Sequence, residues 1–214
     1  MYSVFVHTKE QYDEVKNYPF EMIYTDNKDL LKCDATLYYE VPNYPHEKDL
    51  PPNIYIQDFG CLYKYKDKNI VTGTNLNIAN SLSIESLMRF KVKKITLSLE
   101  CTLEELKFLK GASFYPLEVV LYHRPLVMTL KRHPLIKSSH YELEDYEHKH
   151  YKILARENGE VLIYHYEVIN HFTLQKDYEA LGISHFQIRF VFENKEEVLD
   201  VLENLFKTDH PCHL

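Results

Sequence analysis

Residues 69–106 constrain the fold most, because two strand-like and two helical segments alternate within them. Residues 70–76 are rich in β-forming side chains, and Ser83 begins a segment whose apolar residues recur at helical spacing. Residues 94–100 alternate like a strand, and residues 102–105 have the spacing of a capping box that opens a second helix. Two strands joined by a helix of this length predict a right-handed βαβ crossover and therefore a parallel sheet.

The same alternation of strand and helix extends over most of the chain. Eight strands are expected, at residues 2–7, 21–26, 35–41, 54–56, 70–76, 94–100, 117–122 and 185–192. Eight parallel strands separated by helices predict an α/β fold, a closed (β/α)8 barrel of the TIM type. The segments after the second and fourth strands leave room for only about one turn of helix, so we expect a distorted barrel. An open doubly wound sheet is the alternative, although no Gly-rich loop follows any strand as a nucleotide site would require.

Residues 131–171 interrupt this alternation. Two strand-like runs, residues 151–155 and 160–166, flank an Arg-Glu-Asn-Gly turn, and Asn-Gly between β-runs is a strong hairpin signal. We therefore expect a small antiparallel β insertion before the last β/α unit. The barrel would then comprise residues 1–130 and 172–207, followed by a flexible tail at residues 208–214.

Composition and charge argue against several classes of function. The net charge of -7 disfavours nucleic acid as a partner, because binding phosphates depends on Lys and Arg. The four cysteines lie far apart without a CxxC pair, which predicts reduced thiols in the cytoplasm rather than a disulfide framework or a zinc ribbon. Lys9 and Glu10 interrupt the amino terminus before an apolar signal core can form, and no apolar run has the length of a membrane span. We therefore expect neither export nor membrane association.

Polar residues gather where the expected strands end, which is where a barrel places its chemistry. These residues are His7, Asp26, Glu40, Asp58, Asn75, Asn77, Ser98, Glu100, His123, Arg124 and Arg189. Carboxylates, imidazoles and guanidinium groups on one rim predict a site for a small polar or anionic ligand. Two alternatives stay open: strand ends are polar in any barrel because they meet solvent, and Asn77 and Asn80 stand where asparagine commonly caps a helix.

Histidine and cysteine give weaker indications of chemistry. His148 and His150 would share one face of a strand near His165, and three such ligands could hold zinc. However, a chain with twelve histidines produces such neighbours by chance and has no HExxH helix, so no metal is predicted. Cys101 follows a strand without an assigned basic partner, and we expect it to be a half-buried thiol rather than a nucleophile.

Three motifs at the ends of consecutive expected strands resemble those of one enzyme family. Residues 76–81 (LNIANS) are similar to its LNxxNS motif, and residues 98–100 (SLE) to its SxE motif. Residues 120–128 (VLYHRPLVM) resemble its VxYGRLPLM segment, with Arg124 and Met128 in place and His123 where the family has glycine. Together these motifs resemble the collagenase-like peptidases, peptidase family U32, over residues 55–205.

The resemblance implies a hydrolase or modification enzyme that binds a small polar or peptide-like ligand at the carboxyl-end rim of the barrel. It suggests Glu100, His123 and Arg124 as catalytic residues and Asn77, Asn80 and Ser98 as ligand-binding residues. His7, Asp26 and Arg189 are added to the ligand-binding set because they stand at the ends of expected strands. No trio of these side chains has a recognisable protease pattern, so peptidase activity is an expectation from the resemblance alone.

The chain departs from the family pattern at the cysteines that bind the iron–sulfur centre. Many members carry a cysteine cluster for an iron–sulfur centre, whereas here the first such position is His133 and no cysteine lies between Cys101 and Cys212. We therefore expect the cluster to be lost and no cofactor to be bound. The long amino-terminal portion of the family is also missing, so the alternative function is a non-catalytic barrel that works as a homodimer or as the partner of a full-length relative.

Overall fold

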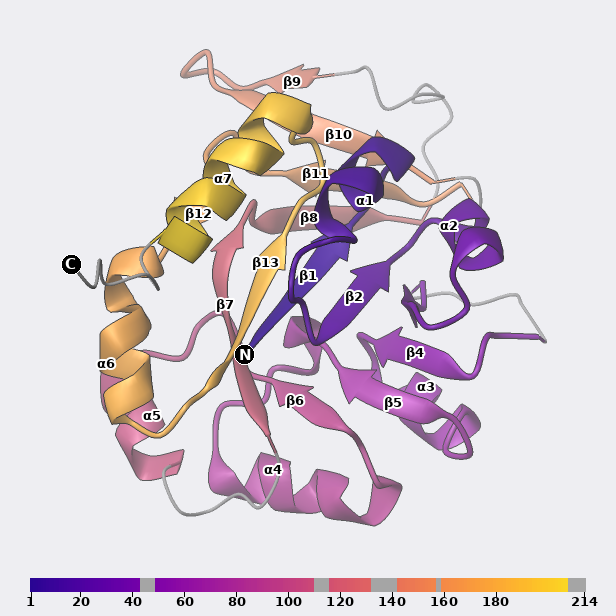
Figure 1. Ribbon diagram of the computed structural model, residues 1–214, viewed down its shortest axis with the longest axis vertical. Coiled ribbons are helices and arrows are strands. Elements are labelled where there is room, and N and C mark those ends of the chain that lie inside the picture. Colours follow the sequence, from indigo (N-terminus) through magenta and orange to yellow (C-terminus); the bar gives the residue numbers. More distant parts are fainter. Residues whose placement is uncertain (43–48, 110–115, 132–141, 157–158, 208–214) are drawn as a thin grey trace. The chain divides into compact units, whose positions relative to one another are not determined.

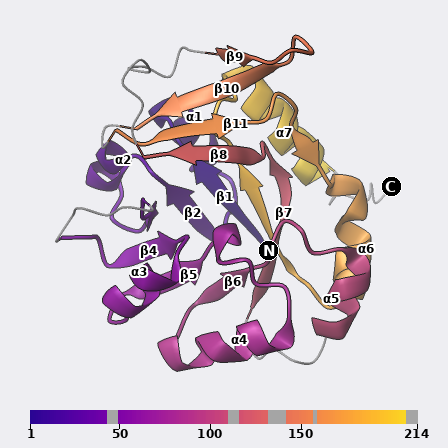
Figure 2. The same ribbon diagram turned by 180° about the vertical axis from the view of Figure 1, so that it is seen from behind.

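The structure, a computed structural model, describes residues 1–42, 49–109, 116–131, 142–156 and 159–207 (Figures 1 and 2). It divides into two compact units, one of Met1–Leu121 with His171–Leu214 and the other of Tyr122–Asn170. The expected flexible tail at residues 208–214 lies outside the described residues, as does His133.

The first unit is a barrel of parallel strands. Its strands are β1 (Tyr2–Val6), β2 (Met22–Thr25), β3 (Tyr38–Glu40), β4 (Asn53–Ile56), β5 (Asn69–Thr72), β6 (Lys94–Thr96), β7 (Leu117–His123, as far as Leu121) and β13 (His185–Arg189). Hydrogen-bonded neighbours follow the order β7-β13-β1-β2-β3-β4-β5-β6, and β6 pairs with β7, which closes the barrel. Strand pairs around the ring are parallel. The predicted closed (β/α)8 barrel is therefore confirmed.

The helices of this unit lie outside the ring of strands in both views (Figures 1 and 2). They are α1 (Lys9–Val15), α2 (Lys28–Cys33), α3 (Phe59–Lys64), α4 (Ser81–Leu87), α5 (Leu103–Leu109), α6 (Gln175–Ala180) and α7 (Lys195–Lys207), with single 3-10 turns η1 (Thr74–Leu76), η2 (Met88–Phe90) and η3 (Phe172–Leu174). Capping boxes open α1, at Thr8 and Gln11, and α5, at Thr102 and Glu105. None of the helices within the described ranges combines the length and apolar character needed to traverse a bilayer.

The hydrophobic core lies mainly between the strands and the helices. Six outward-facing strand residues are aliphatic and fully buried: Val4, Ile54, Ile56, Ile70, Ile95 and Ile188. Each such side chain removed from water contributes about 1.5–3 kcal/mol to folding. This outer layer explains why the strands read as apolar and β-branched in the sequence.

The inside of the barrel is polar to an extent that the sequence pattern does not reveal. Paired residues of adjacent parallel strands project on the same face of the sheet, so the register defines the inward set. Its polar members include Ser3, Tyr24, Tyr38, Glu40, Tyr55, Lys94, Thr96, Glu118, Gln187 and Arg189, and its apolar members include Phe5, Met22 and Val71. Lys94 Nζ donates to Ser3 Oγ at 2.9 Å and lies 3.3 Å from Glu118 Oε1. Charged groups therefore occupy the centre of the barrel.

Two central strands end earlier than the sequence predicts. β5 stops at Thr72 instead of residue 76, because the chain turns at Gly73 into η1 and reaches Asn77 in the left-handed region at φ 54°. β6 stops at Thr96 instead of residue 100. Both differences place polar side chains on loops rather than on strands, at the carboxyl end of the barrel.

The second unit contains a four-stranded antiparallel sheet in the order β8-β11-β10-β9. Its strands are β8 (Leu126–Leu130), β9 (Glu142–Glu144), β10 (His150–Ala155) and β11 (Val161–Tyr164), and the two-residue β12 (Ile169–Asn170) pairs with the end of β7. The predicted hairpin is confirmed, with Ala155 opposite Val161. The unit begins at Tyr122 and not at residue 131, because β8 pairs with β11.

Candidate functional site

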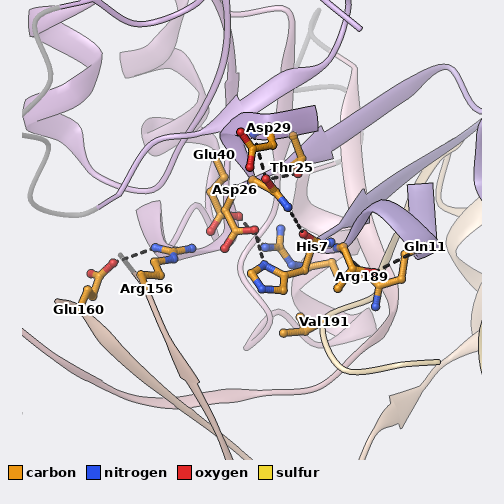
Figure 3. A network of polar contacts seen from close by, with 12 residues as sticks. His7, Gln11, Thr25, Asp26, Asp29, Glu40, Arg156, Glu160, Arg189 and Val191 are labelled. Carbon is orange, nitrogen blue, oxygen red and sulfur yellow. Dashed lines mark hydrogen bonds and ion pairs between the residues drawn. The ribbon is translucent and has the colours of Figure 1, made fainter. Parts of the chain in front are cut away.

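A histidine and an aspartate from neighbouring strand ends meet at the carboxyl-end rim of the barrel. His7 directly follows β1 and Asp26 directly follows β2, and both continue the inward alternation of their strands. His7 Nδ1 lies 2.7 Å from Asp26 Oδ1 (Figure 3). The Asp26 side chain is 3% exposed and that of His7 26%. Since an ionised carboxylate only accepts hydrogen bonds, this contact holds the proton on Nδ1 and makes Nε2 the basic nitrogen of the ring.

The main chain of His7 is held on both sides by amide side chains, those of the buried Gln11 and the half-buried Asn27. Gln11 Oε1 accepts hydrogen bonds from the backbone nitrogens of His7 at 2.8 Å and Thr8 at 3.1 Å. Gln11 Nε2 donates to the carbonyl oxygen of Glu193 at 2.9 Å, and Asn27 Nδ2 donates to that of His7 at 3.1 Å. Gln11 is 1% exposed. The loops after β1, β2 and β13 are thereby tied to the residue that carries the imidazole.

An ion pair spans the same end of the barrel interior. Arg189 Nη2 lies 2.5 Å from Glu40 Oε2, and the two side chains are 13% and 8% exposed (Figure 3). The guanidinium carbon lies 4.1 Å from the ring centroid of Phe5 and 5.5 Å from that of Tyr55. Both rings therefore lie within cation–π range of the guanidinium group. Burial, first of all, raises the pKa of the Tyr55 hydroxyl to about 12, so this phenol stays neutral.

The lack of a side chain at Gly73 leaves space for the side chain of Gln57 at this rim. A Cβ at Gly73 would lie 2.3 Å from Gln57 Oε1 and 2.6 Å from Tyr55 Cε1. Gln57 Oε1 accepts from the backbone nitrogen of Asn75 at 3.0 Å, and its Nε2 lies 3.5 Å from Glu40 Oε2. Only a residue without a side chain fits at position 73, and its absence of a Cβ lets Gln57 reach the ion pair.

The asparagines and the serine of the predicted ligand set hold loops together. Ser98 Oγ donates to Asn77 Oδ1 at 2.5 Å, which connects the loops after β5 and β6. Asn80 Oδ1 accepts from the backbone nitrogen of Ser83 at 2.9 Å, so Asn80 caps α4. Glu100 is exposed, and its backbone nitrogen donates to Ser98 Oγ at 3.2 Å. These contacts support the structural alternative for Asn80 and give Asn77 and Ser98 a shared structural role.

The remaining predicted catalytic residues, His123 and Arg124, belong to the second unit. His123 is 5% exposed and pairs with Ile169 in the short antiparallel ladder. Arg124 Nη1 donates to the main-chain oxygens of His165 and Tyr166, at 3.1 and 2.5 Å. Within that unit Arg124 therefore anchors the chain that follows β11.

Neither a reactive thiol nor the histidine metal site finds support among the described residues. Burial, followed by the charge of Asp58, raises the pKa of the Cys61 thiol to about 11, and burial also raises the pKa of Cys101. Such thiols are poor nucleophiles because they stay protonated. His148 lies in the turn before β10 with φ 61°, so it does not share a strand face with His150 as predicted. No group of metal-binding side chains occurs among the residues that the structure places.

Two residues of this site escape the sequence-based prediction. Gln57 stands two residues after the inward-facing Tyr55 of β4. Because side chains alternate between the two faces of a strand, Gln57 could have been predicted to point inward once the inward face of β4 was known. Gln11 is recognisable in the sequence only as part of a capping box. Neither its bond to His7 nor its bond to Glu193 follows from spacing, because the second partner is 182 residues away.

Comparison of the chain with protein-family models, with curated proteins and with solved structures gives no match. The resemblance to the collagenase-like peptidases therefore stays a prediction, and the candidate site is interpreted from its own geometry.

Proposed function

We propose that this chain is a hydrolase of the collagenase-like peptidase type that acts on a small polar or peptide-like substrate at the carboxyl-end rim of the barrel. The observation that carries the proposal is the contact of 2.7 Å between His7 Nδ1 and Asp26 Oδ1. A buried carboxylate that orients an imidazole, with the imidazole itself partly exposed, is the arrangement of a general base and its orienting partner.

The pair acts on water in this proposal. His7 Nε2 takes a proton from a water molecule while the water oxygen adds to the carbonyl carbon of the substrate. Asp26 stabilises the imidazolium that forms, and the same proton then passes from Nε2 to the leaving nitrogen as the bond to carbon breaks. Glu100, His123 and Arg124 keep the roles that the resemblance implies as separate predictions.

Two substitutions test this proposal. Hydrolysis of a panel of fluorogenic amino-acid amides and dipeptides is measured for the wild-type chain, His7→Gln and Asp26→Asn. Losing the general base is expected to lower kcat about 10²–10⁴-fold, and losing its orienting partner by a similar factor. His150→Gln is the matched control, because this histidine is 57% exposed in the second unit.

Two outcomes of the hydrolysis assay would contradict the proposed function. Full activity in His7→Gln, with the fold retained by circular dichroism, would remove His7 from the mechanism. A wild-type chain that binds ligands of the panel and turns over none of them would instead support the alternative of a non-catalytic binding barrel.

A further inference from the structure

A basic surface lies on the side of the barrel that carries α3 and η2, at residues 63–68 and 89–93. These two stretches hold six of the chain's 25 lysines and arginines but only one of its 32 aspartates and glutamates. Basic and apolar residues alternate in both, and the apolar Tyr65, Phe90 and Val92 are buried, which leaves the charges outside. The exposed cations, which we call the basic surface, are Lys64, Lys66, Arg89, Lys91 and Lys93.

The two stretches lie side by side because they precede the neighbouring strands β5 and β6. The backbone nitrogen of Lys93 donates to the carbonyl oxygen of Ile70 at 2.7 Å. The guanidinium carbon of Arg89 lies 5.9 Å from the ring centroid of Tyr63, a residue that is 62% exposed. The basic surface therefore includes an exposed aromatic ring, and tyrosine is enriched in protein interfaces.

Carboxylates do not neutralise this surface. Exposed lysines elsewhere on the barrel pair with a carboxylate one turn of helix away, as Lys16 does with Asp13 and Lys32 with Asp29, both at 2.6 Å. Within the part of the chain that the structure describes, none of the five cations of the basic surface forms such an ion pair. Their charge is therefore available to an anionic partner.

The opposite side of the barrel carries the complementary charge. In the closed ring of strands, three strands separate β1 from β5 in either direction, and α1 and α7 follow β1 and its neighbour β13. Figures 1 and 2 show α1 and α7 on one side of the ring and α3 and α4 on the other. Residues 9–16 and 195–206 hold seven aspartates and glutamates but only three lysines. The exposed carboxylates, which we call the acidic surface, are Glu10, Glu196, Glu197, Asp200 and Glu203.

We propose that the basic surface of one copy of this chain binds the acidic surface of a second copy. The two surfaces lie on opposite sides of one compact unit, so they cannot meet within a single copy. Two basic or two acidic surfaces repel each other, so the copies associate head to tail. A long nucleic acid fits less well, because beyond the basic surface it would meet a chain with a net charge of -7. This inference does not depend on the proposed hydrolysis.

Sedimentation velocity of the full wild-type chain tests the proposal. It is measured at rising protein concentrations in about 0.01 M and about 1 M salt, where the Debye length is about 30 Å and about 3 Å. The average sedimentation coefficient is expected to rise with protein concentration in low salt only, because salt screens contacts between exposed charges. A monomer at every concentration in low salt, or association of equal strength in both salts, would overturn the proposal.

Charge reversal identifies the two surfaces. Lys91→Glu with Lys93→Glu reverses the basic surface, and Glu196→Lys with Asp200→Lys reverses the acidic surface. Each double variant alone is expected to associate about tenfold more weakly than the wild type, or less. Mixing the two is expected to restore association, because each surface of one variant then meets its opposite charge on the other. A mixture that stays monomeric while both variants keep the wild-type circular dichroism spectrum would refute the assignment.

A matched control and a second probe separate this contact from other effects of charge. Lys32→Glu with Lys107→Glu makes the same change in net charge at two exposed lysines outside both surfaces, and it is expected to associate like the wild type. A single-stranded RNA oligonucleotide is also titrated into the wild-type chain. RNA binding that disappears in Lys91→Glu with Lys93→Glu, in a chain that shows no self-association, would assign the basic surface to nucleic acid instead.

Discussion

Lys94 and Glu118 form an ion pair at the centre of the barrel, with 3.3 Å between Nζ and Oε1 and side-chain exposures of 1% and 0%. Glu118 also accepts hydrogen bonds from Thr96 at 2.9 Å and Gln187 at 3.1 Å. Lys94 Nζ donates to Glu21 Oε2 at 2.7 Å as well. A charged interior of this kind depends on complete pairing, because each unpaired member would be costly.

We expect Lys94→Met to lower the free energy of unfolding by about 3–5 kcal/mol, because it leaves Glu118 buried without its cation. Urea unfolding followed by circular dichroism measures the change. The double substitution Lys94→Met with Glu118→Leu removes both charges and is expected to recover much of the loss. Lys32→Met is the control, since Lys32 is 77% exposed, and a loss of the same size there would contradict the explanation.

The pKa of the Glu21 carboxyl leads us to expect that the fold is less stable in acid. Burial alone would raise its pKa, but the hydrogen bond and charge of Lys94, with help from His185, outweigh burial and lower it below 4.5. A carboxyl whose pKa is lower in the folded than in the unfolded chain stabilises the fold above its unfolded pKa. That stabilisation disappears as the pH falls through the folded pKa.

We therefore expect the free energy of unfolding of the wild-type chain to decline below about pH 4.5. Glu21→Gln should show a shallower decline in urea unfolding measured across this range. Glu104→Gln is the control, because its side chain is 79% exposed. Identical pH profiles for wild type and Glu21→Gln would show that this carboxyl does not contribute.

Gly73→Ala is expected to destabilise the barrel by about 1–3 kcal/mol, because it inserts a methyl group into a filled space. The new Cβ would lie 2.3 Å from Gln57 Oε1 and 2.6 Å from Tyr55 Cε1. Gly60→Ala is the matched control, since a Cβ there would meet Asp58 Oδ1 at 3.0 Å, a milder contact with the end of a side chain. Thermal melts of both variants give the comparison, and equal effects would argue against crowding at position 73.

The closed barrel could be predicted because each of its strands and helices is recognisable from a short stretch of sequence. Each strand shows as a β-rich run and each helix as a spacing of apolar residues, and the crossover rule then fixes the parallel sheet. The hairpin of β10 and β11 was equally accessible from its Asn-Gly turn. Placing β8 with that hairpin was not, because Val161 pairs with Leu130 across 31 residues and no local pattern records the pairing.

The candidate site was predictable as a set of residues but not as a set of contacts. His7, Asp26 and Arg189 follow from strand ends, yet the pairing of His7 with Asp26 depends on β1 and β2 being neighbours at this register. Asn80 shows the opposite case, since its spacing to Ser83 already contains the capping interaction. Contacts between distant parts of the chain are the ones that sequence spacing leaves undetermined.

Gln11 should act on the reaction through His7 without touching the substrate. In Gln11→Leu the backbone nitrogens of His7 and Thr8 and the carbonyl of Glu193 lose their shared partner, and the imidazole shifts relative to Asp26. A misplacement of about 1 Å can cost about 10²-fold in rate, so we expect kcat to fall by about 10–10²-fold with a smaller change in KM. The lost bonds should also lower the free energy of unfolding by about 1–3 kcal/mol.

Two measurements separate this positioning role from simple loss of capping. Thr8→Ala removes the cap of α1 while Gln11 Oε1 can still bind the His7 nitrogen, so it should lower stability by about 0.5–2 kcal/mol and leave kcat near that of the wild type. Nuclear magnetic resonance of the His7 ring nitrogens should show the proton on Nδ1 in the wild type and in Thr8→Ala, and a mixture of tautomers in Gln11→Leu. An unchanged His7 spectrum in Gln11→Leu, together with an unchanged kcat, would limit Gln11 to a structural role in α1.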